Sequence, residues 1–211
     1  MPTVAPAELA RSLQGLNLYL VGMMGAGKSA VGRPLALALG YRFIDADEVL
    51  ERSAGRTIPQ IFSREGEEGF RDLETAVLNE LAQWHSLVVA TGGGVVTRPV
   101  NWGHLHQGVV IWLDAPEHVL LRRLNADPTP RPLLADPDPD ERLRQLLERR
   151  RPLYAQADLR VNQGLETPEE VASRVLEALP SLLRDRAQPP EDPISLRWAD
   201  GRPCPSLEGP A

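Results

Sequence analysis

The chain has 211 residues, with 29 acidic and 23 basic side chains, a net charge of −6 and 42% hydrophobic residues. This length suits one α/β domain with a short appendage, and the acidic balance gives no general attraction to nucleic acid or to an anionic membrane. The sequence has no run of about 18 apolar residues and no signal-peptide pattern at its start, so we expect a cytoplasmic protein. The single cysteine, Cys204, excludes an internal disulfide.

Short apolar runs of strand type alternate with helical patterns over most of the chain. Residues 1–15 are expected to form a loose lead-in, with room for one helical turn over residues 7–13. We then expect strands over residues 16–21, 41–44, 86–90, 109–113 and 159–162. Apolar residues at helical spacing predict helices over residues 28–39, 45–53, 66–84, 116–124, 139–154 and 168–179, the first of them kinked at Pro34. This alternation favours one α/β domain over residues 16–182, with a central parallel sheet covered by helices on both faces.

Two proline-rich segments interrupt this pattern. Residues 125–140 hold five prolines in sixteen positions, which is too irregular for a helix or strand and long for a connection, so we expect a mobile lid. Residues 186–211 hold six prolines and no apolar periodicity, and their composition predicts a disordered tail.

Residues 22–29 read GMMGAGKS and match the phosphate-binding pattern G-x-x-x-x-G-K-[ST] between a predicted strand and a predicted helix. The glycines let backbone N–H groups turn inward, and the helix directs its positive dipole end at the same anion. Lys28 is the only lysine among the 23 basic residues, so we expect it to contact nucleotide phosphates, with Ser29 on Mg²⁺. The alternative is a glycine-rich turn beside a solvated lysine.

Asp45 and Asp47 follow the second predicted strand, at the carboxyl edge where ligands of open α/β sheets bind. One carboxylate can then face Mg²⁺ and the other a substrate hydroxyl. The competing interpretation is that one of them caps the next helix.

Further candidates are the glycine run at residues 92–94 and several arginines. Three glycines directly after a buried strand permit close approach of a ligand to the backbone. Arg71 precedes Glu74 by three positions, which also fits an ordinary surface ion pair. Residues 149–151 are all arginine, and at least one of them can face the site even though basic residues at a helix C-terminus often only complement the dipole.

In chain order, the segments GMMGAGKS, FIDAD, GFRDLE, ATGGG, RPLL and RPLYAQAD resemble those of shikimate kinase. The resemblance covers about residues 15–180. It implies a three-layer P-loop kinase fold with a five-stranded sheet and a mobile lid. It also implies transfer of a phosphoryl group from ATP to the 3-hydroxyl of shikimate, with Mg²⁺, in the pathway to chorismate and the aromatic amino acids. The expected enzyme is a monomer with no nucleic-acid or membrane partner.

The resemblance assigns a role to each candidate residue. The catalytic residues would be Lys28, Asp47, at the accepting hydroxyl, and Arg131, carried onto the phosphates by the lid. The nucleotide would be bound by Gly25, Ala26, Gly27, Lys28, Ser29, Ala30, Arg123, Arg131 and Pro168. Shikimate would be bound by Asp47, Arg71, Gly92, Gly93, Gly94 and Arg151, and Mg²⁺ by Ser29 and Asp45, the latter through water.

Gln156, Asn162 and Pro34 depart from the pattern of the family. The first two leave fine details of nucleotide binding open. Two rival functions also remain: a kinase of the same fold for gluconate or a nucleoside monophosphate, and a nucleotide-sensing protein without chemistry. Two arginines directed at one carboxylate favour shikimate, and the joint presence of Lys28, Asp45, Asp47 and Arg131 favours catalysis.

Overall fold

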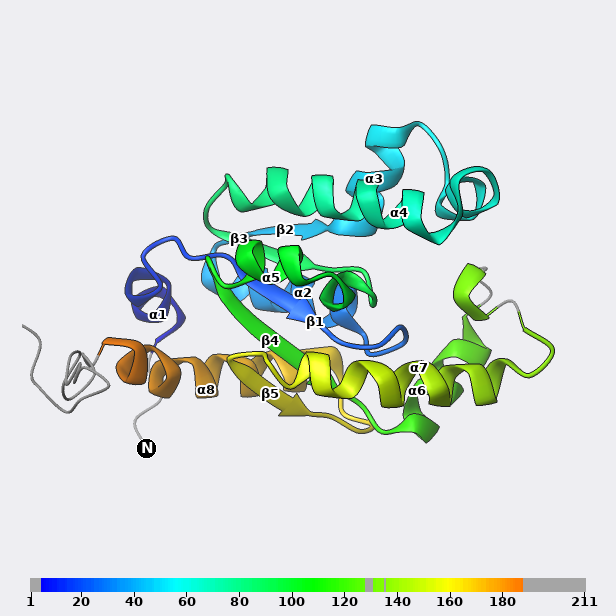
Figure 1. Cartoon of the computed structure of the whole chain (residues 1–211). Coiled ribbons are helices and arrows are strands. Elements are labelled where there is room, and N and C mark those ends of the chain that lie inside the picture. Colours follow the sequence, from blue (N-terminus) through cyan, green and yellow to red (C-terminus); the bar gives the residue numbers. More distant parts are fainter. Residues whose placement is uncertain (1–4, 128–130, 135, 188–211) are drawn as a thin grey trace, which may run out of the picture.

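The computed structural model describes residues 5–127, 131–134 and 136–187. Its centre is a sheet of five parallel strands in the order β2-β3-β1-β4-β5 (Figure 1). The strands are β1 (Leu18–Val21), β2 (Arg42–Asp45), β3 (Leu87–Ala90), β4 (Val109–Asp114) and β5 (Leu159–Asn162). The three central strands are buried along their whole length, as their continuous apolar sequences predict.

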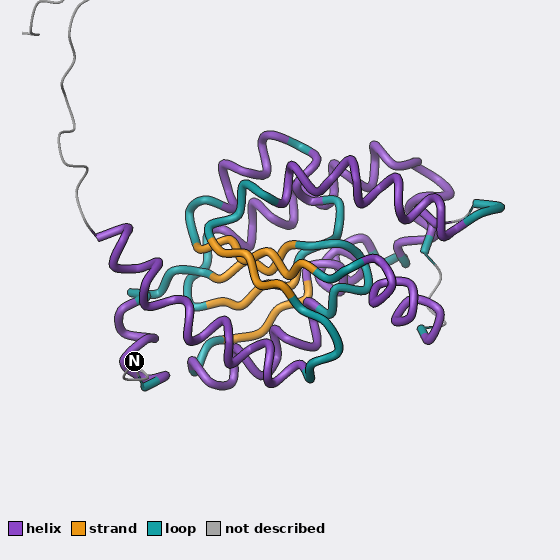
Figure 2. Tube along the Cα trace, turned by 90° about the horizontal axis from the view of Figure 1, so that it is seen from below, coloured by secondary structure: helices purple, strands orange, loops and turns teal. Residues whose placement is uncertain are grey.

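Helices cover both faces of the sheet (Figure 2), which confirms the three-layer α/β fold. Because side chains alternate along a strand, Leu18 and Leu20 of β1 face one core and Tyr19 and Val21 face the other. The first core is closed mainly by α1 (Pro6–Ser12), α2 (Lys28–Leu39), α6 (Glu117–Ala126) and α8 (Pro168–Ala187). The second is closed mainly by α4 (Ile58–Ala82) and α5 (Pro99–Leu105), with α3 (Ala46–Ala54) packed on α4.

The helix predicted from residue 66 is present, and a helical piece that was not predicted precedes it from Ile58, the two together forming α4. Thr57 and Gln60 form a capping box at its start, a T-x-x-Q signal that the proline at position 59 obscured. At Gly66 the backbone leaves the helical region, with φ of 71° and ψ of −172°, so α4 consists of two helical pieces. A positive φ of this kind suits glycine, which has no Cβ.

Three further details differ from the sequence predictions. Helix α1 confirms the helical turn expected within the lead-in, but it packs on the core where a loose segment was expected, since Leu9 and the C-cap residue Leu13 are buried. Helix α5 and the short 3₁₀ turn η1 (Val95–Thr97) were not predicted. Helix α2 continues through Pro34 to Leu39, ending at Gly40 as expected.

The two proline-rich segments are only partly described. In the lid, α6 extends to Ala126, a 3₁₀ turn η2 covers Pro132–Leu134, and α7 runs over Pro139–Tyr154. Helix α8 reaches Ala187, beyond the predicted end of the domain at residue 182, and the tail from residue 188 lies outside the described residues. Within the part of the chain that the structure describes, no helix is long and apolar enough to cross a membrane.

Candidate active site

The phosphate-binding loop lies between the buried strand β1 and the N-terminus of α2. Gly25 and Gly27 adopt left-handed φ values of 79° and 80°, which only glycine takes without strain. Gly27 occupies the N-cap position of α2 without a side-chain hydrogen bond, and the first turn holds no acidic residue. The first N–H groups of the helix therefore remain available to an anion.

Lys28 folds back over the loop. Its Nζ donates to the carbonyl oxygens of Gly22 at 2.9 Å and Met23 at 3.1 Å. The pKa of Lys28 is lowered to about 8, mainly by burial; Arg131 and Arg150 contribute in the same direction, and Asp47 and Asp45 oppose them. A phosphate placed beside this ammonium would raise its pKa again, because a nearby negative charge favours the protonated form.

Asp45 ends β2 and does two things at once. Its Oδ1 accepts hydrogen bonds from the backbone N–H groups of Asp47 and Glu48, so it is the N-cap of α3, as the competing interpretation proposed. Its Oδ2 accepts a 2.5 Å hydrogen bond from Ser29 Oγ, which joins β2 to the phosphate loop. Capping and participation in the site are therefore compatible.

Asp47 is the second residue of α3. Its carboxylate points toward the glycine run, since a Cβ added at Gly92 would lie 3.0 Å from Asp47 Oδ1. Burial raises the pKa of Asp47 to about 6, with Asp45 contributing in the same direction and Lys28 opposing. A carboxylate with a raised pKa beside a phosphate loop is suited to accepting a proton near neutral pH.

The glycine run packs directly against charged side chains. Arg71 is 3% exposed, donates to Glu74 at 2.7 Å and to Glu67 at 3.1 Å, and occupies the space that a Cβ at Gly94 would need. The Arg71–Glu74 pair is therefore buried, and the surface ion pair is excluded. Glu74 Oε1 is buried with no hydrogen-bond partner among the described residues, and burial raises the pKa of this carboxyl.

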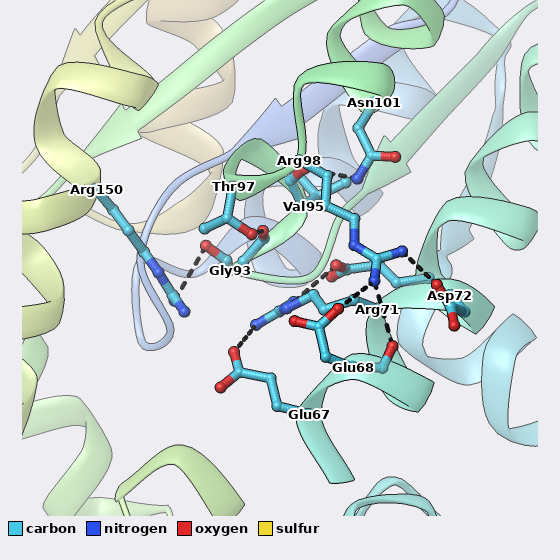
Figure 3. Close-up of polar contacts among 12 residues, drawn as sticks. Glu67, Glu68, Arg71, Asp72, Gly93, Val95, Thr97, Arg98, Asn101 and Arg150 are labelled. Atoms are coloured by element: carbon cyan, nitrogen blue, oxygen red, sulfur yellow. Dashed lines mark hydrogen bonds and ion pairs between the residues drawn. The ribbon is translucent and has the colours of Figure 1, made fainter. Parts of the chain in front are cut away.

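The structure brings Arg150, and not Arg151, to this place. Arg150 is 4% exposed and its Nη1 donates to the carbonyl of Gly93 at 3.4 Å, so Arg150 and Arg71 reach the glycine run from different helices (Figure 3). The side chain of Arg151 is 50% exposed and lies 3.6 Å from Asp114. The sequence analysis expected the side chain of Arg151 here, and the structure places that of Arg150 here instead, because adjacent residues of a helix point about 100° apart.

Three adjoining cavities follow the carboxyl edge of the sheet. The largest, about 740 Å³, contains Asp47, Arg71, Glu74 and Arg150 together with the glycine run. It shares Ser29, Asp45, Asp47, Gly93 and Arg131 with a cavity of about 290 Å³ over the phosphate loop. That cavity shares Gly27, Ala30 and Arg123 with a third of about 390 Å³, lined also by Pro168.

A further cavity of about 430 Å³ lies between β2, α3 and α4. Its lining is mostly apolar, and it contains none of the residues predicted to form the site. The three adjoining cavities are therefore the candidate active site.

Arg123 and Gln163 form part of the wall of the cavity beside Pro168, and Arg123 also lines the phosphate-loop cavity. Arg123 donates to the carbonyls of Gly25 at 3.3 Å and Gly164 at 3.2 Å. Gln163, which the sequence analysis did not single out, is buried, donates to the carbonyl of Ala26 at 2.6 Å and accepts from Arg123 at 3.3 Å. Together they join the segment after β5 to the phosphate loop.

Arg131 lines both the large cavity and the phosphate-loop cavity. It pairs with Asp127 at 2.7 Å, while its buried Nε has no hydrogen-bond partner among the described residues. The guanidinium is therefore near the phosphate loop with donor capacity left for a ligand.

Comparisons with known proteins identify the family of this chain. The family model for shikimate kinase matches residues 24–180. The shikimate kinase of Synechococcus sp. (strain RCC307) is 61% identical over 188 residues, covering 89% of this chain and 96% of that protein.

Solved structures are also similar. A shikimate kinase from Acinetobacter baumannii in complex with shikimate has a TM-score of 0.78 and 41% identity, covering 85% of this chain and 99% of that one. A gluconokinase from Sinorhizobium meliloti, at a TM-score of 0.53 and 20% identity over 82% of this chain and 95% of its own, shares the fold alone. Because the family model matches residues 24–180 and the Synechococcus enzyme is 61% identical, the chain belongs to the shikimate kinase family.

Proposed function

We propose that the chain transfers the γ-phosphoryl group of ATP to the 3-hydroxyl of shikimate, forming shikimate 3-phosphate. The observation that carries this proposal is the large cavity, where two buried guanidinium groups, Arg71 and Arg150, lie beside Asp47 and adjoin the phosphate loop. The guanidinium groups suit a carboxylate, and Asp47 suits a hydroxyl. A substrate that is both an acid and an alcohol fits this combination.

In the proposed reaction, Asp47 orients the hydroxyl and accepts its proton. The hydroxyl oxygen forms a bond to the γ-phosphorus, the bond from that phosphorus to the β,γ-bridging oxygen breaks, and ADP leaves. Lys28 and Arg131 stabilise the charge that develops on the transferring group and on the leaving oxygen. Water must be kept away because it would compete for the phosphoryl group, and this is the role we assign to the lid.

The acid group of shikimate would be held by Arg71 and Arg150 and by backbone N–H groups of the glycine run. Glu74 orients Arg71 through their 2.7 Å ion pair. Its second oxygen, which has no partner among the described residues, is an acceptor for another hydroxyl of the substrate. In this proposal the two arginines bind the acid group, while Asp47 and Glu74 bind different hydroxyls of the same small molecule.

Mg²⁺ would be held by Ser29 and by Asp45, the latter through water. The two oxygens lie 2.5 Å apart at the N-terminus of α2, and hydroxyl and carboxylate oxygens are suitable donors for this ion. Among the described residues no group of three or more metal-binding side chains occurs. This agrees with an ion that takes its other oxygens from phosphates and water. When bound, Mg²⁺ supplies charge neutralisation for the phosphates.

We place the adenine in the cavity lined by Arg123 and Pro168, and the phosphates over residues 25–30. ATP use follows from membership of the family. We propose a monomer in the cytoplasm, where ATP is available, because each element of the site is supplied by one chain.

A coupled assay of ADP release tests the proposal. Shikimate should support turnover, whereas gluconate and nucleoside monophosphates at the same concentration should not. The methyl ester of shikimate should be a poor substrate because it removes the charge that Arg71 and Arg150 bind. Turnover with gluconate that exceeds turnover with shikimate would reject the proposal.

A further inference from the structure

Tyr154, the last residue of α7, is fully buried, and its hydroxyl donates to the carbonyl of Gly93 at 2.5 Å. The partners are 61 positions apart in the sequence. Arg150 approaches the same oxygen at 3.4 Å, so the tyrosine provides the shorter of the two contacts. This places a neutral donor directly behind the glycine run that lines the large cavity.

The tyrosine ring is fixed by packing. It stacks on Trp112 of β4, with the ring centroids 5.8 Å apart and the planes inclined by 26°. Arg160 lies over Trp112 at 4.6 Å and is itself bound to Asp114 at 2.6 Å. The hydroxyl is thus positioned from a central strand, and burial raises the pKa of Tyr154 to about 12, so it remains protonated across the physiological range.

The carbonyl of Gly93 belongs to the peptide that also carries the N–H of Gly94. A trans peptide is planar, and its C=O and N–H point in opposite directions, so holding one fixes the other. In the described part of the chain, the N–H groups of Gly93 and Gly94 have no hydrogen-bond acceptor. Three glycines have few steric limits on their backbone angles, and an external contact is needed to select one conformation.

We infer that Tyr154 is a positioning residue for recognition of the substrate's acid group. By holding the Gly93 carbonyl it sets the direction of the Gly94 N–H, and by satisfying that oxygen it leaves Arg150 available for the carboxylate. This inference rests on the proposed function, because it assumes that the glycine run and Arg150 bind a carboxylate.

The test is Tyr154→Phe, which removes only the hydroxyl and keeps the stacked ring. The quantity to measure is the ratio of kcat/KM for shikimate to kcat/KM for its methyl ester. That ratio does not depend on the fraction of enzyme that is folded. We expect the ratio to fall about threefold to tenfold, the range spanned by one hydrogen bond, with KM for shikimate raised and KM for ATP unchanged.

Tyr19→Phe is a matched control. Tyr19 is also fully buried in the same core, and its hydroxyl accepts a 3.3 Å hydrogen bond from Asn17, away from the cavity. Its loss should leave the acid-to-ester ratio unchanged. If Tyr154→Phe keeps the wild-type ratio, or if Tyr19→Phe lowers it equally, the inference fails while the proposed function stands. If the wild-type enzyme does not prefer the acid, the carboxylate assignment fails, and this inference with it.

Discussion

Burial moves the pKa values of Lys28 and Asp47 toward each other, to about 8 and about 6. The proposed reaction needs the lysine charged and the aspartate deprotonated, so only the interval between these values provides both forms. We therefore expect a bell-shaped pH profile of kcat/KM for ATP, with limbs near pH 6 and pH 8, since this parameter reports the free enzyme. A profile that is flat from pH 5 to pH 9 would contradict these assignments.

Asp47→Asn should reduce kcat strongly and ATP affinity little, yet stabilise the fold. The folded-state pKa of about 6 lies above the ordinary value of 3.8, so the folded protein binds the proton more tightly and loses stability as pH rises between these values. At pH 8 the charged carboxylate costs about 3 kcal/mol, from about two pH units at 1.4 kcal/mol each. Urea unfolding should show this gain in the variant at pH 8 and almost none at pH 3.

Equal stability of the wild type and the Asp47→Asn variant at pH 8 would mean that burial does not raise the pKa of Asp47. A large loss of ATP affinity, measured by titration, would instead place Asp47 in the metal site.

Lys28→Arg should lower kcat by about 10²-fold or more, close to the cost of losing one preorganised donor. The ammonium of Lys28 fits between the carbonyls of Gly22 and Met23, whereas a planar guanidinium is larger and directs its donors differently. Single-turnover measurements with saturating ATP would check this, with circular dichroism as the control for folding. Activity close to wild type would show that any cation suffices here.

At the scale of elements, α7 offers a matched pair of variants. Arg150→Ala should raise KM for shikimate about 10-fold to 100-fold, because a buried charge-assisted hydrogen bond is worth about 1.5–3 kcal/mol. Arg151→Ala removes the same charge one position later, but its 3.6 Å contact with Asp114 is half exposed and contributes little. Initial-rate kinetics on both variants give the KM for shikimate that tests this difference. A larger effect from Arg151 would contradict the orientation of α7 described here.

The lid contributes Arg131. Arg131→Ala should reduce phosphoryl transfer by about 10³-fold, by analogy with arginines that act on the transferring group in other P-loop enzymes, while ATP binding changes much less. Arg122→Ala is a suitable control, because Arg122 lines the cavity beside Pro168 and does not line the large cavity or the phosphate-loop cavity. ADP and shikimate 3-phosphate should be measured in the same reaction. Near-normal transfer in the Arg131 variant would reduce this segment to an ordinary surface loop.

At the scale of the whole molecule, α8 is the last described helix that packs on the sheet. Val171, Val175 and Leu179 of α8 are buried in the first core, and the composition of the following 24 residues predicts a segment that buries little. Truncation after Ala187 should therefore leave kcat/KM unchanged and shift Tm by no more than about 2 °C. A loss of several degrees in a thermal melt would show that the tail, through Trp198 for example, docks on the domain.

Features built from residues that are neighbours in the sequence could be predicted without the structure. The phosphate loop, the cap at Asp45 and the glycine run each lie within a few residues, next to a strand that the apolar pattern identifies. Parallel strands place their carboxyl ends on one edge, so these segments converge without further information. The first helical piece of α4, which was not predicted, also has a local signal, since the capping box at Thr57 and Gln60 is visible in the sequence.

Only the tertiary structure decided which side chains enter the cavity. Three adjacent arginines at residues 149–151 are equivalent as a pattern, and the packing of α7 against β4 and the glycine run selects Arg150. The contact between Tyr154 and Gly93, and that between Gln163 and Ala26, joins segments 61 and 137 positions apart. The physical reason is that the rotation of a helix about its axis is set by burial against its neighbours, and a local pattern does not record those neighbours.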